Sequence, residues 1–461
     1  MKKVLAFLLV AVLGLSVFSV VGCNNYPTDS SITKPNSTSP TNTTRPTNTT
    51  SPTNTTKPTT TKKDEANLDP PEDYPKASEG LAFKLTADGK GYEVSSGEFY
   101  GQDLVIPYSY NELPVVAIAA EGFVGGLRSI TMPDTITEIG RWGLARNSIE
   151  EIKLSANLKK VGESAFEGCS NLKTIHIPAS VEEIGECVFA YCESLESVTV
   201  DSDSKYYKTL DGVLYTKDER VLVWCPPKGI TSYTVSEATE IIAPYAFYMN
   251  QSLKNIVLPS NLRLIEKFAF STCLLLESVN IPASVYDIGL YAFSNCEGMK
   301  TITFEKNSIL ENIQDGAFEA CFLLKEIKIP ASVMTIYPCA FRACSSLERV
   351  EFEQGSRLER IYSEGFAYCE SLEEIELPSN LEMIFGMAFI GCGLSKVSIP
   401  VSIKIIGDQA FSNCLDLTEM YYAGTADDWA KIDIDSQWIL SIEKLEFLLI
   451  CTDQTVKVNS Y

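Results

Sequence analysis

The residues that commonly carry out catalysis or bind metals are unevenly supplied in this chain. Its 461 residues include 14 cysteines but a single histidine, His176, which we interpret as a surface residue. One histidine argues against a Ser-His-Asp triad and excludes a zinc site built from several histidines. The motifs Gly-Xaa-Ser-Xaa-Gly and His-Glu-Xaa-Xaa-His and a phosphate-binding glycine loop are missing from the sequence. A carboxylate pair among the 60 acidic residues could hydrolyse a glycoside, but no pattern identifies one. We therefore expect a protein that is not an enzyme and holds no metal or cofactor.

Nine of the cysteines recur at one spacing, three residues after a phenylalanine, and most successive copies are 22 to 25 residues apart. The pairs are Phe166/Cys169, Phe189/Cys192, Phe270/Cys273, Phe293/Cys296, Phe318/Cys321, Phe341/Cys344, Phe366/Cys369, Phe389/Cys392 and Phe411/Cys414. Weaker copies keep the same frame at Phe123/Gly126, Leu144/Asn147 and Phe247/Asn250. Zinc needs cysteines that converge on one point, which one cysteine in every ~23 residues does not supply. We interpret these cysteines as buried, mostly reduced structural thiols.

The segment that carries each cysteine has the pattern of a short repeating unit. In one copy, Ile175 and Ile177 alternate with polar residues as in a half-buried strand. Pro178 ends this strand because proline has no N–H for the strand ladder. Ile184 belongs to a second apolar rung, and the segment ending at Phe189 is predicted to form a single helical or 3₁₀ turn. A unit this short cannot bury its own apolar residues, so successive units must stack into a solenoid.

These units resemble the leucine-rich repeat of the BspA-like, treponemal-type family of bacterial surface lipoproteins. The elements Ile-Pro-Ala-Ser-Val, Ile-Gly and Ala-Phe-Xaa-Xaa-Cys carry the resemblance, which extends over about residues 81–425. It implies an α/β repeat fold, a leucine-rich-repeat solenoid of about 12 repeats of about 23 residues, with a strand-rich insert and a C-terminal cap. It also implies an inward ladder of cysteine or asparagine side chains that meet backbone groups at the turns. The ladder residues are Cys169, Cys192, Asn250, Cys273, Cys296, Cys321, Cys344, Cys369, Cys392 and Cys414.

The N-terminus has the features of an export signal followed by a spacer. A basic start precedes an apolar run that ends in Val-Val-Gly-Cys23, which is similar to the lipobox of bacterial lipoproteins. That similarity implies that the signal peptide, residues 1–22, is removed and that Cys23 carries a lipid. The alternatives are an ordinary secretory signal and an uncleaved anchor, and all three export the rest of the chain. Residues 23–63 are rich in Thr, Pro and Asn and are predicted to be a disordered stalk.

The body of the chain is strongly acidic. The formal net charge is −22, and residues 64–461 hold 31 basic and 59 acidic residues. This balance argues against nucleic-acid binding, because phosphate backbones are bound by clustered Lys and Arg. We divide the body into a solenoid over residues 64–420, a hairpin insert over 201–240 within it, and a C-terminal cap over 421–461.

The outward residues of the parallel strands form one continuous face in a solenoid, and that face is the usual binding surface. It is small and polar in the middle repeats and strongly charged in the later ones. A charged face is more often merely solvated than functional. The functional interpretation is a polar, salt-sensitive patch that binds protein and favours basic partners. Its candidate residues are Asn280, Thr303, Lys328, Arg349, Glu351, Glu374 and Glu376.

The insert is an alternative site because aromatic residues gather in it. Exposed aromatic rings could stack on a sugar or anchor a protein partner, although such residues more often pack a hairpin onto its scaffold. The residues are Tyr206, Tyr207, Tyr215, Trp224 and Tyr233.

Together these features predict a protein that is exported and lipid-anchored on the surface of a bacterial cell. The resemblance to the BspA-like family implies adhesion, with host matrix proteins or other bacteria as partners. The alternatives are a glycan-binding or glycan-degrading surface protein that uses the aromatic insert, and a scaffold that assembles other envelope proteins. We expect a monomer that meets the membrane through the lipid on Cys23.

Overall fold

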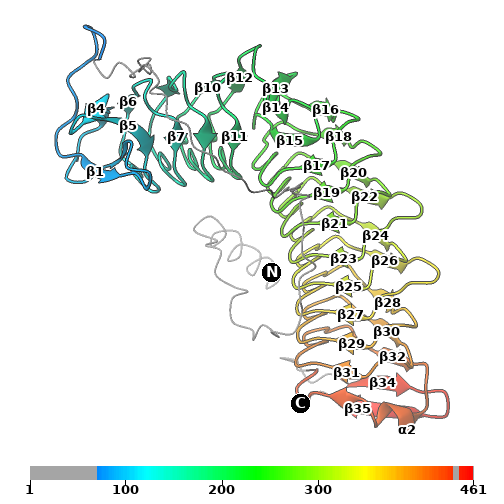
Figure 1. Ribbon diagram of the computed structural model, residues 1–461. Helices are drawn as coiled ribbons and strands as arrows, with labels where there is room; N and C mark the ends of the chain where they lie inside the picture. Colours follow the sequence, from blue (N-terminus) through cyan, green and yellow to red (C-terminus); the bar gives the residue numbers. More distant parts are fainter. Residues whose placement is uncertain (1–69, 440–445, 460–461) are drawn as a thin grey trace, which may run out of the picture. The chain divides into compact units, whose positions relative to one another are not determined.

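The computed structural model describes residues 70–439 and 446–459. The predicted signal peptide, Cys23 and the predicted stalk lie outside the described residues. The described residues form a stack of about 14 coils, with strands along two sides (Figure 1). The predicted solenoid is therefore confirmed. Within the described stretches no helix is both long and apolar enough to cross a membrane.

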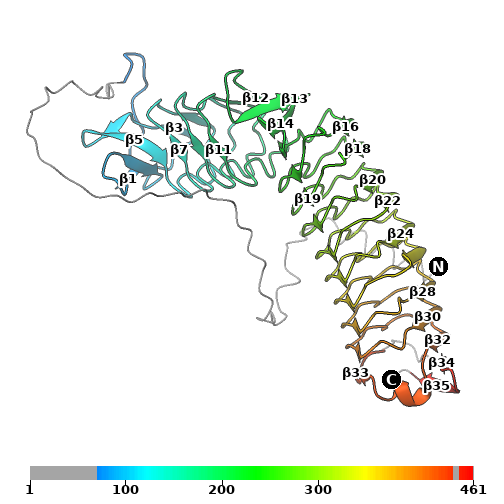
Figure 2. The same cartoon turned by 45° about the vertical axis from the view of Figure 1, so that its right-hand side comes forward.

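Each coil contributes one strand to each of two parallel columns, which Figures 1 and 2 show running side by side along the stack. The first column holds the strand that precedes the proline of each repeat, and the second holds the shorter Val/Ile rung. The first column contains β3 (Asp103–Val105), β6 (Ser129–Thr131), β8 (Glu151–Ile152), β10 (Thr174–Ile177), β12 (Ser197–Val200), β16 (Ser232–Thr234), β18 (Asn255–Val257), β20 (Ser278–Ile281), β22 (Thr301–Phe304), β24 (Glu326–Ile329), β26 (Arg349–Phe352), β28 (Glu374–Glu376), β30 (Lys396–Ile399), β32 (Glu419–Tyr422) and β34 (Glu446–Ile450). The second column contains β5 (Leu113–Ile118), β7 (Glu138–Ile139), β9 (Lys160–Val161), β11 (Glu183–Ile184), β15 (Val221–Trp224), β17 (Ile241–Ile242), β19 (Leu264–Ile265), β21 (Asp287–Ile288), β23 (Asn312–Ile313), β25 (Thr335–Ile336), β27 (Arg360–Ile361), β29 (Met383–Ile384), β31 (Ile405–Ile406) and β33 (Asp433–Ile434).

The remaining elements lie at the two ends and at the insert. Near the N-terminal end, β1 pairs antiparallel with β2, and β4 pairs antiparallel with β5. In the insert, β13 pairs antiparallel with β14, and β14 with β15. At the C-terminal end, β35 pairs antiparallel with β34. These elements are β1 (Ala82–Leu85), β2 (Tyr92–Ser95), β4 (Ser109–Tyr110), β13 (Tyr207–Leu210), β14 (Val213–Thr216), β35 (Thr455–Asn459) and the short helix α2 (Ala426–Trp429).

The insert divides the buried side chains into two apolar cores. Leu214 on β14 belongs to the core on the N-terminal side, while its neighbours Val213 and Tyr215 belong to the core on the C-terminal side. Both strand columns are interrupted at the same place, because β11 and β12 each end a sheet. We call residues 92–200 the first stack and residues 232–434 the second stack.

Phenylalanine rings form the centre of the second stack. Eight rings, from Phe247 to Phe411, are fully buried and lie face to face. Successive ring centroids are 4.7 to 5.5 Å apart, with planes inclined by 3 to 15°. Each such aromatic pair adds about 0.5–1.5 kcal/mol beyond the burial of its area, so the ring column ties every coil to its neighbours.

The segment around each ring is built from consecutive turns instead of the predicted helical or 3₁₀ turn. Phe268 and Thr272, two residues before and after the ladder phenylalanine, have left-handed backbone with φ of 56° and 60°. As a result, the N–H groups of Phe268, Phe270 and Thr272 all point along the stack and donate to carbonyls of the next coil at 2.9, 2.7 and 2.8 Å. A helix would use these N–H groups in hydrogen bonds within its own coil. In the consecutive turns they bond to the next coil instead, so the turns join the coils to each other.

The ladder cysteines also join successive coils. Each of the nine thiols donates to a backbone carbonyl one coil earlier, that of the residue in the ladder phenylalanine position, at 3.0 to 3.4 Å. Asn250 does the same with its amide, which donates to the carbonyl of Pro226 at 2.7 Å. Burial raises the pKa of Cys344 to about 12, so its thiol keeps the proton that the bond requires.

The C-terminal end of the second stack is closed by a strand-rich cap. The carbonyls of Gln437 and Trp438 each accept an N–H of the last coil, from Gln409 and Phe411, at 3.1 Å. The Trp438 ring stands edge-on to Phe411, with centroids 6.1 Å apart. The cap therefore supplies both the acceptors and the aromatic contact that a further coil would have supplied.

Candidate binding surface

The outward face of the first column follows from strand alternation. In β24 the side chains of Glu326 and Lys328 are exposed, while those of Ile327 and Ile329 are buried. Because successive strands pair in register, these outward positions line up from coil to coil. The face therefore consists of two neighbouring columns of polar side chains.

In the middle coils the polar side chains of this face are bonded to each other. The Thr303 hydroxyl donates to Asn280 Oδ1 at 2.8 Å, and Asn280 Nδ2 donates to Glu305 at 3.3 Å. The second carboxylate oxygen of Glu305 accepts the backbone N–H of Ala283 at 3.1 Å. This part of the face offers a partner few unengaged groups.

In the later coils the sign of the charge alternates along one column. Successive coils place there Glu326, Arg349, Glu374, Lys396 and Glu419. Lys396 Nζ lies 3.7 Å from Glu374 and 4.0 Å from Glu419. Opposite charges on adjacent strands contribute about 0.2–1 kcal/mol per pair, so part of this charge stabilises the sheet.

A hollow of about 700 Å³ lies across β26 to β32 on this charged face. Its lining contains four carboxylates and two cations, and one wall is formed by Tyr421, whose hydroxyl donates to Glu419 at 2.7 Å. The lining residues are Glu348, Arg349, Glu373, Glu374, Ile375, Glu376, Lys396, Ser398 and Tyr421. The hollow is therefore acidic and open to solvent, which suits a basic partner.

Three of the seven predicted face residues line the hollow, namely Arg349, Glu374 and Glu376. Glu351 lies beside it as the ion-pair partner of Arg349. The other predicted residues lie on earlier strands and do not line it: Asn280, Thr303 and Lys328.

The repeat frame places Lys396 and Ser398 on the outward columns, but the set of candidate residues ended at Glu376, and Tyr421 was missed. Lys396 and Ser398 occupy the outward positions of the repeat that follows Glu374 and Glu376. Tyr421 aligns with Ser398 one repeat later, in residues assigned to the cap. Extending the repeat frame by one unit is the signal that finds Tyr421.

The aromatic residues of the insert do not form an open binding site, and this prediction is corrected. Of the five, Tyr206 alone is exposed, while the others are at most 8% exposed. The hydroxyls of Tyr215 and Tyr233 are 2.9 Å apart, and the Tyr207 hydroxyl accepts the N–H of Ile184 at 2.8 Å. Trp224 meets the ladder ring of Phe189 edge-on. The insert lies between two apolar cores, and these rings pack into them. Tyr207 and Trp224 also line a cavity of about 300 Å³ beside the insert.

His176 lies on the outward face, half exposed, and bridges two strands. Its ring nitrogens are 2.9 Å from the Thr199 hydroxyl and 3.1 Å from Asp201. The other carboxylate oxygen of Asp201 accepts the N–H of Ala179 at 2.9 Å. Both residues therefore have structural partners. In the part of the chain that the structure describes, no group of three or more His, Cys, Asp or Glu side chains is placed to hold a metal.

Comparison with protein families identifies the repeat. A family model described as the BspA type leucine rich repeat region matches residues 96–209, 226–348 and 306–418, in six copies. The chain belongs to this BspA-type family. The predicted resemblance is confirmed, and the matches span both stacks of this BspA-type protein.

One solved structure supports the same fold, and two others are reported as similar chains. A leucine-rich repeat protein from Eubacterium ventriosum is 22% identical, with a TM-score of 0.57, and the match covers 69% of this chain and 94% of that one. A leucine rich cell surface protein from Faecalibacterium prausnitzii is 27% identical, with a TM-score of 0.47 and coverage of 79% and 99%. A leucine-rich repeat protein from Bacteroides ovatus is 24% identical, with a TM-score of 0.48 and coverage of 80% and 100%. Among curated proteins none matches this chain.

Proposed function

We propose that this protein is a lipid-anchored, surface-exposed binding protein that takes basic segments of partner proteins into the acidic hollow of β26 to β32. The observation that carries the proposal is the excess of carboxylates over cations in a hollow of about 700 Å³. Membership of a repeat family also supports binding, because stacked repeats offer an extended surface.

The N-terminal sequence supports the proposed location. Val-Val-Gly-Cys23 follows an apolar export signal, and the polar residues 23–63 would hold the solenoid away from the membrane. In this arrangement residues 64–420 bind the partner, residues 201–240 divide the solenoid, and residues 421–461 cap it. The chain acts as a monomer on the bacterial envelope.

The proposed role is adhesion, with host matrix proteins or neighbouring bacteria as partners. A glycan site at the insert aromatics loses its support, since four of those five residues are buried. A scaffold role inside the envelope would use the same face. Chemical cross-linking on intact cells separates the two, because an adhesin captures partners from outside and a scaffold captures envelope proteins.

A binding assay tests the hollow. Full-length protein carrying Cys23→Ser is measured against immobilised fibronectin, laminin, collagen and mucin, and against whole bacteria. We expect the pair Glu374→Gln and Glu376→Gln to weaken protein binding at least tenfold, and added salt to weaken it too, because exposed charges are screened.

The matched control is the pair Glu297→Gln and Glu370→Gln, which removes two exposed carboxylates outside the hollow. Unchanged binding is expected there. Equal losses in both pairs, or no binding to any surface by folded protein, would refute the proposed adhesin.

Lipid attachment is tested separately by metabolic labelling with a radioactive fatty acid. The wild-type chain should take up label and fractionate with membranes. Cys23→Ser should lose both properties, while the neighbouring substitution Asn24→Ser should keep them.

A further inference from the structure

Backbone N–H groups at alternate residues of each turn donate regularly to the next coil. In the coil before the junction of the two stacks, Ser164, Phe166 and Gly168 donate at 2.9, 3.1 and 2.8 Å. In the first coil after it, Tyr245 and Phe247 donate at 3.2 and 2.7 Å. The ladder is therefore complete on either side of the insert.

The ladder is interrupted at the junction itself. The N–H groups of Cys187, Phe189 and Tyr191 occupy the same three positions, and none of them has a hydrogen-bond acceptor among the described residues. The next coil is that of β15, where the N–H of Cys225 makes the regular bond to the carbonyl of Ala246 at 2.8 Å. The coil that contains β15 is too short to supply carbonyls to the three N–H groups.

This opening contrasts with the C-terminal end of the second stack. There the cap places the carbonyls of Gln437 and Trp438 on the last coil's N–H groups. Both ends share a tryptophan that meets the last ladder ring, Trp224 at the junction and Trp438 at the cap. The junction thus has the tryptophan contact that closes the C-terminal end, but it lacks the carbonyl acceptors that accompany that contact in the cap. A ligand carbonyl would give these N–H groups the acceptor that the junction does not supply.

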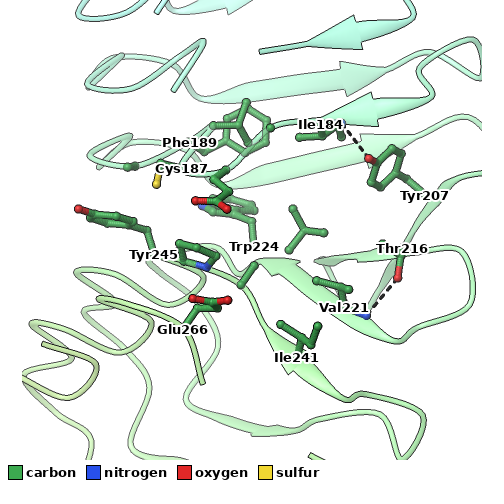
Figure 3. Close-up of a pocket in the computed structure, with 17 residues that line it drawn as sticks. Ile184, Cys187, Phe189, Tyr207, Thr216, Val221, Trp224, Ile241, Tyr245 and Glu266 are labelled. Carbon is green, nitrogen blue, oxygen red and sulfur yellow. Dashed lines mark hydrogen bonds between the residues drawn. The ribbon is translucent and has the colours of Figure 1, made fainter. Parts of the chain in front are cut away.

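A cavity of about 300 Å³ lies where the coil is missing. Figure 3 shows Cys187 and Phe189 on one side of it, and Ile241, Tyr245 and Glu266 on the other. Its apolar lining includes Val188, Val223, Trp224 and Pro244. The volume is at the lower end of the range for ligand sites, about 300–1,000 Å³.

Two carboxylates line this cavity, and two more lie near it. Glu186 and Glu266 line it, and Glu163 and Glu167 lie close enough for their charges to act on Cys187. Lys267 is bound to Glu186 at 3.2 Å. Burial, together with the charge of Glu186, raises the pKa of Glu266, so a cation brought beside Glu266 would be favoured.

We propose that the junction cavity binds a peptide segment of another protein. Its backbone carbonyls accept the free N–H groups of Cys187 and Phe189, which line the cavity, and of Tyr191 in the adjoining small hollow, and its lysine or arginine side chain reaches Glu266. The peptide takes the place of the missing part of a coil, in the manner of strand addition to an open sheet edge. This site is separate from the acidic hollow, so each can fail without the other.

The probe is an array of acetylated pentapeptide amides built on valine, with lysine or arginine at each position in turn, and a matched array with glutamate. We expect basic peptides to bind the full-length protein at least tenfold more tightly than acidic ones. Hydrogen exchange resolved to single amides should show Cys187, Phe189 and Tyr191 exchanging fast in the free protein and at least tenfold slower with bound peptide.

A cavity-filling variant gives the decisive comparison. Ala243 lines the cavity at the repeat position that Tyr337 and Tyr362 occupy in other coils, so Ala243→Tyr suits the fold. We expect it to reduce peptide binding at least tenfold. Gln314→Tyr places the same ring at the same repeat position away from the cavity, where it replaces a bond from Gln314 to Asp287, and should bind normally.

Glu266→Gln should remove the preference for basic over acidic peptides without unfolding the protein. Three results would overturn the proposal: no array member binds, the three amides are already protected in the free protein, or Ala243→Tyr binds as well as Gln314→Tyr. If no array member binds, the cavity is a site for water alone.

Discussion

The two stacks use the same repeat but hold their coils together differently. In the second stack eight phenylalanine rings form an unbroken column. In the first stack the corresponding positions include Leu144, and the stacked ladder pair there is Phe166 with Phe189, 6.0 Å apart. The ladder of the first stack likewise includes Asn147 beside Cys169 and Cys192.

The difference shows that polar bonds can replace ring stacking between coils. Asn147 donates to the carbonyls of Phe123 and Leu144, both at 2.8 Å, and accepts the N–H of Leu127 at 2.9 Å. A ladder cysteine such as Cys344 makes one such bond, to Phe318. We therefore expect the first stack to be more sensitive to lost hydrogen bonds, and the second to lost rings and ionised thiols.

Alkaline pH should give the largest difference between the stacks. Burial raises the pKa of the second-stack thiols Cys296, Cys321, Cys344, Cys369 and Cys414 above 9.0, and of Cys169 and Cys192 in the first stack. The folded state therefore holds protons that the unfolded state releases above about pH 9, so stability is full below that pH and falls as pH rises. The loss is about 1.4 kcal/mol at pH 10 for each thiol that ionises in the unfolded state alone.

Pulsed thiol labelling during denaturant unfolding, read by mass spectrometry, reports each cysteine separately. Between pH 8 and pH 10 the unfolding midpoint of the second-stack cysteines should fall more than that of Cys169 and Cys192. Equal shifts in both stacks, or a rise in either, would contradict the role given to the buried thiols.

Removing one ring should be the next largest effect. Phe318→Ala deletes a fully buried ring stacked on both sides, and we expect a loss of about 4 kcal/mol in the free energy of unfolding. Leu144→Ala, at the same position in the first stack, should cost about 1 kcal/mol less because no stacked pair is lost. Urea denaturation measures both, and equal costs would show that stacking adds nothing beyond burial.

Removing the asparagine should act mainly on the first stack. Asn147→Ala leaves the buried N–H of Leu127 without its acceptor, and we expect a cost of about 2 kcal/mol. The reference is Asn250→Ala in the second stack, which also leaves a buried N–H, that of Leu253, without its acceptor. The stacked rings Phe247 and Phe270 remain beside it there. Calorimetry measures the free energy of unfolding of both variants. A larger loss for Asn147→Ala than for Asn250→Ala would support the difference between the stacks, and equal losses would contradict it.

The smallest effect should come from a single thiol. Cys344→Ala removes one bond to the Phe318 carbonyl and one sulfur atom, and we expect a loss of about 1 kcal/mol. Cys344→Ser keeps a donor and serves as the control for the bond. If Cys344→Ala lowered the free energy of unfolding as much as Asn147→Ala, the two stacks would not differ in how their ladder residues contribute to stability.

The sequence predicted the coil well because the spacing of its apolar residues and prolines follows directly from the geometry of short strands. The alternation of Ile175 and Ile177 predicted β10, and Pro178 follows directly after that strand. The interval between phenylalanine and cysteine predicted which residues meet from coil to coil. The left-handed residues Cys187 and Tyr191 had no such signal, since their side chains do not favour that backbone. The turns were therefore expected to be helical.

The insert and the hollow were harder for a related reason. Tyr215 and Trp224 are aromatic residues on short strands. Alternation of apolar and polar residues reveals the buried face of a strand only when the other face is exposed to solvent. Here the strands lie between two cores, so the sequence could not tell an open aromatic site from packing. The hollow spans four strands, and Tyr421 joins it from a segment whose repeat pattern is weak.

The alternating charges along β24 to β32 limit how the length of this protein can change. The order Glu326, Arg349, Glu374, Lys396, Glu419 repeats its sign every two coils. Duplicating or deleting a single coil within this run would bring two like charges side by side, whereas two coils would keep every neighbour opposite in sign. Along this column, growth by whole pairs of coils keeps the alternation, whereas a single-coil change places two like charges on adjacent strands.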